Sequence, residues 1–145
     1  RVISLWQDDY LDTAVLPSCV WSSEWDVTDG KLNAWVHQRS CDVPLGLPFN
    51  VTQYSVLLHM LAQVADLKPG SLDWSIKDPH IYVNQIEGIE EQIRRGEELE
   101  DLKAPELWLN PDVTDFYDFD SSSECKDVKV LNYKHHGKIR FPLAQ

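Results

Sequence analysis

The sequence predicts an α/β (α+β) fold in which a mixed β-sheet packs against one long buried helix. Asp29-Gly30 lies between two runs of alternating apolar and polar residues, which is the pattern of an antiparallel hairpin. A long apolar stretch, "VTQYSVLLHMLAQVADL", ends at "KPG" and has the length of a helix. Shorter runs rich in β-branched and aromatic residues supply further strands. With 145 residues, the chain is expected to form a single domain over residues 1–145.

The first predicted element is the hairpin of residues 20–39. Side chains alternate between the two faces of a strand. One face of its second strand therefore carries Leu32, Ala34 and Val36, and the other carries Asn33, Trp35 and His37. Arg39 and Ser40 follow at the end of this strand, a place where binding sites are often built.

The long helix is predicted to begin at Asn50. The segment "PLGLPFN" before it contains two prolines and a glycine, which interrupt regular structure. Asn50 with Gln53 three positions later resembles a capping box. Apolar residues of the following stretch cover most of the helix circumference, which favours a central buried helix over a surface one.

Shorter elements are predicted for the second half of the chain. "LDWSIKDPHIYVNQ" is typical of a strand running into a turn, with His80, Tyr82 and Asn84 on one strand face. Residues 84–99 predict a charged amphipathic helix with Ile86, Ile89 and Ile93 pointing inward. "APELWLNP" predicts a strand, and the acidic residues 111–127 a loop. "VKVLNY" and "KIRFPLAQ" predict two closing strands, or a strand and a tail.

Composition narrows the class of protein. The formal net charge of −11 repels nucleic-acid backbones, so we expect no extended nucleic-acid binding. No apolar run reaches the roughly 18 residues of a membrane span. The three cysteines, without a visible secretion signal, favour reduced thiols in a cytoplasmic protein. No CxxC or His-rich spacing indicates a metal site.

Each polar motif, taken alone, has a structural interpretation as well as a functional one. Cys19 is either a buried thiol or a nucleophile, because cysteine is among the most buried residue types. Arg39 and Asp42 could form a surface ion pair. Asn50 is explained as a helix cap, and His80 with Tyr82 as half-buried strand residues.

Taken together, these motifs resemble one family. "LPSC" (16–19), "QRSCDVPLGLPFN" (38–50), "DPHIYVNQIE" (78–87) and the tail "NYKHHGKIRFPLAQ" (132–145) resemble thymidylate synthase. Residues 97–127 match this family least. The resemblance implies a thymidylate synthase-like fold whose N-terminal part is missing. Since the chain begins with Arg1 and its only methionine is Met60, we expect the C-terminal portion of a longer enzyme.

The resemblance implies reductive methylation of dUMP to dTMP with 5,10-methylenetetrahydrofolate as cosubstrate and no metal. A thiolate suits conjugate addition to uracil C6, so Cys19 is the implied nucleophile. Arg39 is its implied activator and, beside Ser40, a phosphate ligand. Asn50 is implied to read the uracil edge, because an amide can accept from N3–H and donate to O4. An aspartate in its place would favour cytosine.

The remaining implied contacts follow from the same resemblance. His80 and Tyr82 match the pair that binds the deoxyribose 3′-hydroxyl, and Gln38 is assigned to the dUMP site. Asp42 matches a contact to the folate ring, because a carboxylate suits the N–H groups of a pterin. Gly46 permits close approach of backbone to ligand, and Ala144 belongs to the tail that folds over folate. The residues assigned to catalysis are Cys19, Arg39, Asn50 and Asp42.

The sequence also departs from the family pattern. Val20, Glu24, Lys77 and Gln85 stand where His, Gln, Gly and His are more usual. Because the residues that the family's N-terminal half supplies are absent, we expect the isolated chain to be inactive and the full protein to be a homodimer. Two alternatives stay open: a pyrimidine hydroxymethylase of the same superfamily, and a catalytically dead nucleotide-binding homologue.

Overall fold

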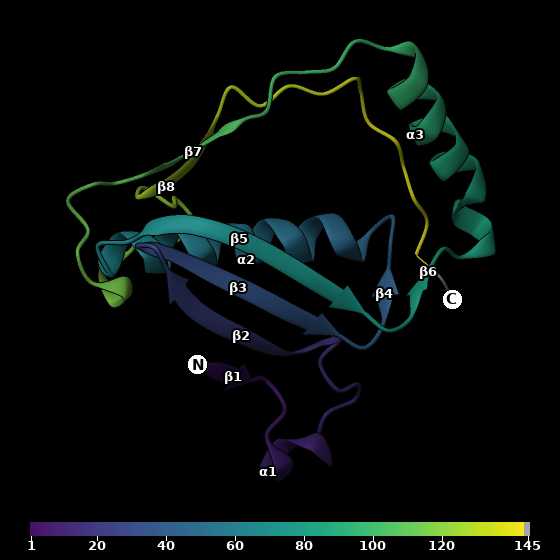
Figure 1. Cartoon of the computed structure of the whole chain (residues 1–145). Coiled ribbons are helices and arrows are strands. Elements are labelled where there is room, and N and C mark those ends of the chain that lie inside the picture. Colours follow the sequence, from purple (N-terminus) through teal and green to yellow (C-terminus); the bar gives the residue numbers. More distant parts are fainter. Residues whose placement is uncertain (144–145) are drawn as a thin grey trace. The chain divides into compact units, whose positions relative to one another are not determined.

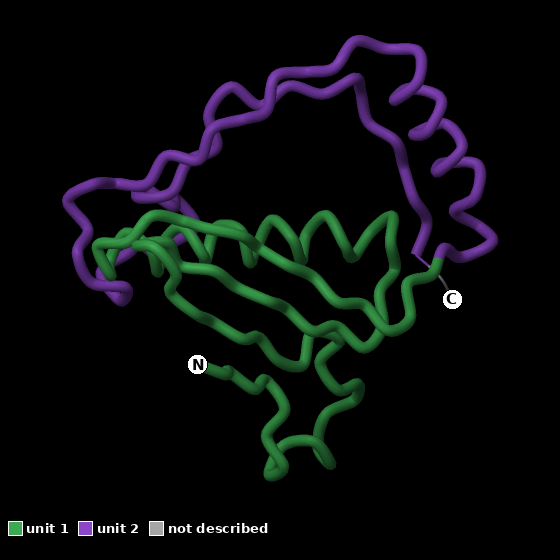
Figure 2. The backbone as a smooth tube through the Cα atoms, in the orientation of Figure 1, with its two compact units in different colours: residues 1–80 green, residues 81–145 purple. Residues whose placement is uncertain are grey.

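A computed structural model describes residues 1–143 of the chain. The chain divides into two compact units, Arg1–His80 and Ile81–Gln145 (Figure 2). The single domain over residues 1–145 therefore stays a prediction.

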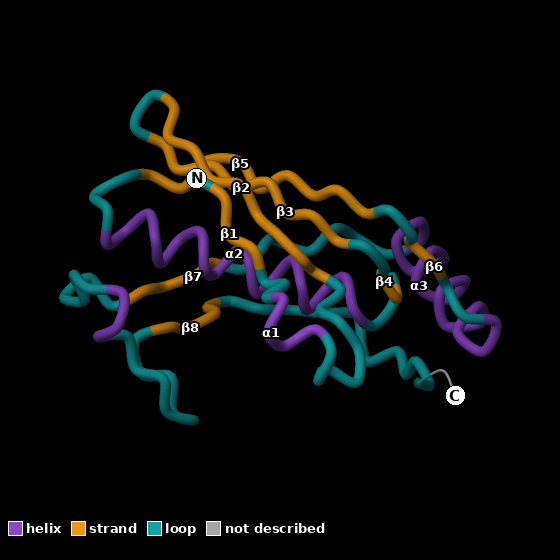
Figure 3. The backbone as a smooth tube through the Cα atoms, turned by 90° about the horizontal axis from the view of Figure 1, so that it is seen from below, coloured by secondary structure: helices purple, strands orange, loops and turns teal. Residues whose placement is uncertain are grey.

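The first unit is built on a mixed four-stranded sheet (Figure 1). Its strands lie in the order β1 (Val2–Ser4), β2 (Val20–Thr28), β3 (Lys31–Gln38) and β5 (Lys68–Ile76). The pairs β1–β2 and β2–β3 are antiparallel, whereas β3–β5 is parallel, with α2 (Gly46–Val64) in the connection. A short helix, α1 (Asp8–Leu11), follows β1. The predicted mixed sheet against a long helix is confirmed, and Figure 3 shows both from a second direction.

The predicted hairpin is confirmed in detail. Thr28 pairs with Lys31 across a two-residue turn in which Asp29 and Gly30 have φ values of 51° and 72°. Positive φ at both positions is the signature of a type I′ turn, whose twist matches that of the flanking strands. Ala34 and Val36 are buried, as their face predicts. The opposite face of β3 carries the exposed Trp35 and the partly buried His37.

The long helix begins four residues earlier than predicted. Helix α2 starts at Gly46, so Asn50 lies inside it and the predicted capping box at Asn50 is wrong. The Asp42 carboxylate Oδ1 instead accepts from the Leu45 backbone N–H at 3.1 Å, just before the first turn. Pro48 is tolerated because the first-turn N–H groups of a helix have no intrahelical acceptor.

The core of the first unit lies between α2 and the sheet. Its buried members are Val20, Trp25, Ala34, Val36, Tyr54 and Leu58. The Tyr54 ring meets the Trp74 ring edge to face, with centroids 5.5 Å apart. Tyr54, Leu58 and Ala62 recur every four residues and form the buried stripe of α2. Phe49 of the same helix is 76% exposed, so within this chain α2 does not bury all of its apolar circumference.

The second unit contains one helix and a two-stranded sheet. A 3₁₀ turn, η1 (Val83–Gln85), leads into α3 (Ile86–Glu98), and β7 (Glu106–Leu109) pairs antiparallel with β8 (Val128–Leu131). Both strands were predicted, and residues 138–143 form no strand. The inward direction predicted for Ile86 and Ile93 is wrong, since they are 46% and 56% exposed. Ile89, the third residue of this predicted face, is partly buried, so the described chain covers the face only in part.

The acidic segment 111–127 is a loop, as predicted, and is held by its own carboxylates. Asp120 accepts from the backbone N–H groups of Lys126 and Ser122 at 3.0 and 2.9 Å. These hydrogen bonds, the one to Lys126 first, lower the pKa of Asp120 to about 2. Asp127 accepts from the Asn110 side chain at 2.7 Å and from the Asp120 backbone at 2.9 Å. The many acidic residues here thus order the loop, including its 3₁₀ turn η2 (Phe116–Asp118).

Candidate active site

Cys19 and Arg39 are brought together by the hairpin. Val20 pairs with Gln38 at the ends of β2 and β3, so the residues just outside the two strands become neighbours. The Arg39 backbone N–H donates to the Cys19 carbonyl at 2.8 Å. The Arg39 guanidinium Nη2 lies 3.8 Å from Cys19 Sγ and also donates to the Pro17 carbonyl. The thiol is therefore held beside a fixed positive charge.

The three cysteines differ in their surroundings, and all are free thiols. Cys41 is buried, and this burial raises the pKa of its thiol. Cys125 is exposed in the acidic loop, and its thiol donates to the Ser122 carbonyl at 3.4 Å. Cys19 is partly exposed and has a guanidinium at its sulfur, which is the setting expected of a nucleophilic thiol. Within residues 1–143, Cys19 alone of the three thiols has a guanidinium at its sulfur, and its assignment as the nucleophile stays a prediction.

Gln38 and Asn50 form a second part of the site. The Gln38 side chain is buried, with 3% of its surface exposed. Its amide Nε2 donates to the Ser40 carbonyl at 2.9 Å and to Asn50 Oδ1 at 3.3 Å. Its Oε1 accepts from the Trp74 indole N–H at 2.9 Å. The hydrogen bond from Gln38 therefore favours the orientation of the Asn50 amide in which Oδ1 points toward Gln38.

Asp42 and His80 face each other on a short parallel ladder. Strand β4 (Cys41–Asp42) pairs with β6 (Pro79–His80), with Asp42 opposite His80. The His80 carbonyl accepts from the Val43 backbone N–H at 3.0 Å. The imidazole Nδ1 of His80 lies 3.1 Å from the Asp78 carbonyl. Strand β4 lies between Arg39 and the start of α2, and β6 follows β5. The structure thus brings both side chains to the β3–α2 connection.

Gly46 is the first residue of α2 and lies between Asp42 and Asn50. A Cβ added there would lie 3.8 Å from Asn50 Oδ1 and 3.9 Å from Asp42 Cβ, which are ordinary contacts. Packing within the chain therefore does not require a glycine here. Its predicted role in the approach of a ligand stays a prediction.

Tyr82 belongs to the second unit, and its prediction is corrected in part. Strand β6 ends at His80, so Tyr82 and Asn84 do not continue a strand face with His80. Tyr82 instead precedes the η1 turn, and its backbone N–H donates to Gln85 Oε1 at 3.1 Å. Pro79 limits the ladder because it supplies no N–H. Ala144, the predicted folate contact of the tail, lies outside the described residues.

Two residues of these networks were not found from the sequence. Trp74 anchors Gln38, and Gln85 holds the backbone of Tyr82. Trp74 stands in no motif. Gln85 lies within "DPHIYVNQIE" but was named only as a departure from the family pattern, so the sequence assigned it no role. Among residues 1–143, no group of three or more His, Cys, Asp or Glu side chains could hold a metal ion. No helix within the same range is long and apolar enough to cross a membrane.

Comparison with known proteins identifies relatives of the chain. The thymidylate synthase family model matches residues 1–145. Thymidylate synthase from Clostridium beijerinckii is 48% identical over 143 residues, which cover 99% of this chain and 52% of that protein. Thymidylate synthase 1 from Bacillus subtilis strain 168 is 43% identical over 144 residues, covering 99% and 49% respectively. The chain thus spans about half the length of the relatives it matches.

The fold agrees as well. The solved structure of thermostable thymidylate synthase A from Bacillus subtilis superposes with a TM-score of 0.87 at 43% identity, covering 98% of this chain and 48% of that one. The family resemblance of the "LPSC", "QRS" and "PFN" segments is therefore confirmed over the whole chain. Matched in sequence from end to end and in fold over nearly all of it, the chain belongs to the thymidylate synthase family.

Proposed function

We propose that the protein catalyses the reductive methylation of dUMP to dTMP with 5,10-methylenetetrahydrofolate as cosubstrate. The observation that carries the proposal is the partly exposed Cys19 thiol with the Arg39 guanidinium 3.8 Å from its sulfur. Because the chain spans about half the length of its relatives, the proposal concerns the whole protein.

Cys19 is the proposed nucleophile. Its thiolate forms a bond to uracil C6, and the electron pair of the C5–C6 double bond moves toward O4, which makes C5 nucleophilic. C5 then bonds to the methylene carbon of methylenetetrahydrofolate and loses its proton to a base, and the bond from this carbon to the folate nitrogen breaks. The resulting tetrahydrofolate transfers a hydride to the methylene group, which becomes the methyl group, and is itself oxidised to dihydrofolate. The thiolate leaves C6 at the end, so the enzyme is regenerated.

Arg39 has two proposed roles. With its Nη2 3.8 Å from Cys19 Sγ, the guanidinium stabilises the negative charge of the thiolate. Its Nε is buried and has no hydrogen-bond partner among the described residues, which leaves a donor for an anionic ligand. With Ser40 next to it, this donor supports the proposed contact to the dUMP phosphate.

Asn50 is proposed to distinguish uracil from cytosine. Gln38 donates to Asn50 Oδ1, which fixes the acceptor end and the donor end of this amide. A fixed amide accepts from uracil N3–H and donates to O4, whereas cytosine presents the opposite pattern. Gln38 is therefore proposed to act through Asn50 and not by direct contact with dUMP.

The remaining assignments are proposed from the family pattern. His80 and Tyr82 bind the deoxyribose 3′-hydroxyl, and Asp42 binds the folate ring. The position of Asp42 supports this, since its Oδ1 already accepts from a backbone N–H and a carboxylate can accept at both oxygens. Gly46 and Ala144 are assigned to the folate site on the family pattern.

We further propose that the protein is a cytoplasmic homodimer. The sheet face opposite α2 carries Trp21, Trp35 and His37, and the ring of Trp6 contacts that of Trp21 at a tilt. Trp21 and Trp35 are 40% and 48% exposed, and neighbouring ring centroids lie 5.1–6.1 Å apart. An exposed aromatic face of this kind is typical of a protein interface. A second copy of the same face would cover it around a two-fold axis.

The test is covalent trapping with 5-fluoro-dUMP in the presence of methylenetetrahydrofolate. Mass spectrometry of the whole protein should show one adduct, located on the peptide that contains Cys19. Cys19→Ser should abolish the adduct, and Cys125→Ser should retain it as the matched control. An unmodified protein, or modification that persists in Cys19→Ser, would contradict the proposal.

A second measurement compares dUMP binding by this chain with dUMP binding by the whole protein. Calorimetric titration with dUMP is carried out on residues 1–145 and on the natural full-length protein. Binding by both means that the dUMP site is largely formed by this chain. Binding by the full-length protein alone means that residues outside the chain complete the site, which is the expected result.

A further inference from the structure

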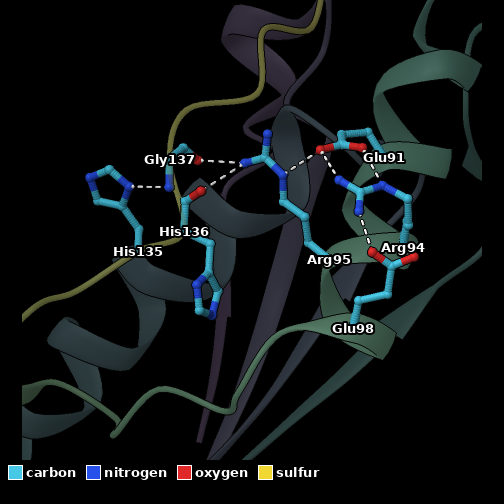
Figure 4. Close-up of polar contacts among 7 residues, drawn as sticks. All are labelled: Glu91, Arg94, Arg95, Glu98, His135, His136 and Gly137. Atoms are coloured by element: carbon cyan, nitrogen blue, oxygen red, sulfur yellow. Dashed lines mark hydrogen bonds and ion pairs between the residues drawn. The ribbon is translucent and has the colours of Figure 1, made fainter.

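The C-terminal segment, residues 136–143, lies along helix α3 and runs in the opposite direction. At the C-terminal end of the helix, Arg95 Nη1 donates to the carbonyls of His136 and Gly137 at 3.1 and 3.0 Å (Figure 4). Arg95 is held in place by Glu91, whose Oε1 accepts from Arg95 Nε at 2.6 Å. His136 Nε2 lies 2.9 Å from the Glu100 carbonyl. This end of the segment is therefore fixed by polar contacts.

In the first turn of α3, the contact depends on the absence of a side chain. A Cβ added to Gly88 would lie 2.6 Å from Phe141 Cε1 and 2.9 Å from Phe141 Cδ1. Contacts under 3.0 Å do not occur for real Cβ atoms, so the Phe141 ring occupies the space that any other residue at position 88 would need. Gly88 and Phe141 thus set the register between helix and segment.

At the N-terminal end of α3, one buried side chain joins the segment to Tyr82. Gln85 is fully buried, with 0% of its surface exposed. Its Oε1 accepts from the Tyr82 backbone N–H at 3.1 Å, and its Nε2 donates to the Pro142 carbonyl at 3.3 Å. Asn84 Nδ2 donates to the next carbonyl, that of Leu143, at 3.3 Å. The Gln85 side-chain carbonyl therefore binds Tyr82, and its side-chain NH₂ group binds the C-terminal segment.

We propose that Gln85 and Gly88 are positioning residues, which fix the C-terminal segment in register with Tyr82. The proposal rests on the proposed function, in which Tyr82 binds the nucleotide and the tail contacts the folate. A shift of the segment along α3 would displace the tail without altering Cys19, Arg39 or Asn50. These two residues therefore act on the use of the folate cosubstrate more than on the binding of dUMP.

The first test compares two glycines of the same helix in the full-length protein. Gly88→Ala places a Cβ into the Phe141 ring, whereas Gly96→Ala meets no atom within 4 Å and is the matched control. We expect Gly88→Ala to raise the KM for methylenetetrahydrofolate at least about fivefold, because small misplacements of ligand contacts are costly. The Kd for dUMP should stay within about twofold. Gly96→Ala should change neither.

Hydrogen exchange of the amides in residues 138–143 gives a readout that does not depend on catalysis. We expect faster exchange in Gly88→Ala than in Gly96→Ala, and recovery when Phe141→Leu is added to Gly88→Ala. Unchanged exchange in Gly88→Ala would overturn the inference about register. Faster exchange with an unchanged folate KM in an active enzyme would overturn its functional part. A wild-type protein without turnover would refute the proposed function, while exchange still reports on the register.

Gln85 is tested with two variants, one that removes only its hydrogen-bond donor and one that removes both donor and acceptor. Gln85→Glu keeps an acceptor for the Tyr82 N–H but places an oxygen against the Pro142 carbonyl. We expect this variant to resemble Gly88→Ala in exchange and in folate KM. Gln85→Met removes both hydrogen bonds and should in addition weaken dUMP binding through Tyr82. Equal dUMP affinities for the two variants would contradict the role of Gln85 as a link between Tyr82 and the tail.

Discussion

Replacing Gln38 with methionine tests how the nucleobase preference is built. Methionine has a similar length and shape but cannot form the hydrogen bonds to the Ser40 carbonyl, Asn50 Oδ1 and the Trp74 indole. At about 0.5–1.5 kcal/mol of net stability for each hydrogen bond, their joint loss lowers the free energy of unfolding by about 3 kcal/mol. The buried position of Gln38 means that water cannot readily replace these partners.

The effect on specificity comes from the Asn50 contact alone. This single hydrogen bond, at about 1 kcal/mol, favours one orientation of the Asn50 amide over the flipped one by about fivefold. The flipped amide would present the pattern that suits cytosine. We therefore expect Gln38→Met to lower the preference for dUMP over dCMP by about fivefold, measured as the ratio of their calorimetric Kd values.

Trp74→Phe is the matched control for this prediction. It removes the donor to Gln38 Oε1 but leaves the hydrogen bond from Gln38 to Asn50. Its free energy of unfolding, measured by urea denaturation, should fall by about 1 kcal/mol with the dUMP preference unchanged. If Gln38→Met retains the preference of the wild type while it loses stability, then Gln38 does not orient Asn50, and this account of the site is wrong.

Three further predictions concern other parts of the chain. Arg94 first, and then Arg95, lower the pKa of Glu91 from 4.5 to about 2. The ionised Glu91 side chain therefore stabilises the fold above about pH 4.5, and this contribution is lost as the pH falls toward 2. In acid denaturation, the free energy of unfolding of Glu91→Gln should fall less over this pH range than that of the wild type. Native-state titration with a thiol reagent should modify two of the three cysteines quickly, because Cys41 is buried; fast reaction of Cys41 would contradict this. If the full-length protein forms the proposed dimer, Trp35→Glu should make it monomeric in light scattering, and a dimer that persists in this variant would exclude the aromatic sheet face as the interface.

The sequence predicted those parts of the fold that are fixed by neighbouring residues. The hairpin was predicted because Asp29-Gly30 adopts the positive φ values that a type I′ turn needs. The start of α2 was missed because Pro48 was taken as a break, although a proline in a first helical turn forfeits no hydrogen bond. Asn50 does not cap α2, because the helix begins at Gly46 and Asn50 lies inside it, where it accepts from Gln38.

The pairing within the site depended on tertiary structure. No spacing rule places Cys19 beside Arg39, twenty positions away; the register of β2 against β3 does. The family resemblance supplied these residues as a set, and the structure adds how the chain holds them. Trp74 and Gln85 were assigned no role because their partners are fixed by tertiary structure: Trp74 donates to Gln38, and Gln85 bonds to Tyr82 and Pro142.

The two glycines of α3 show what sequence reasoning lacks. A glycine inside a helix costs roughly 0.5–1 kcal/mol relative to alanine, so propensity treats Gly88 and Gly96 alike. The structure separates them, because the Phe141 ring fills the space beside Gly88 and nothing lies beside Gly96. Gly96→Ala should therefore raise the free energy of unfolding by about that amount, whereas Gly88→Ala should show no gain, since the helix benefit is offset by displacement of Phe141. An equal gain in both variants would mean that the Phe141 ring moves aside freely, and that Gly88 does not hold the C-terminal segment.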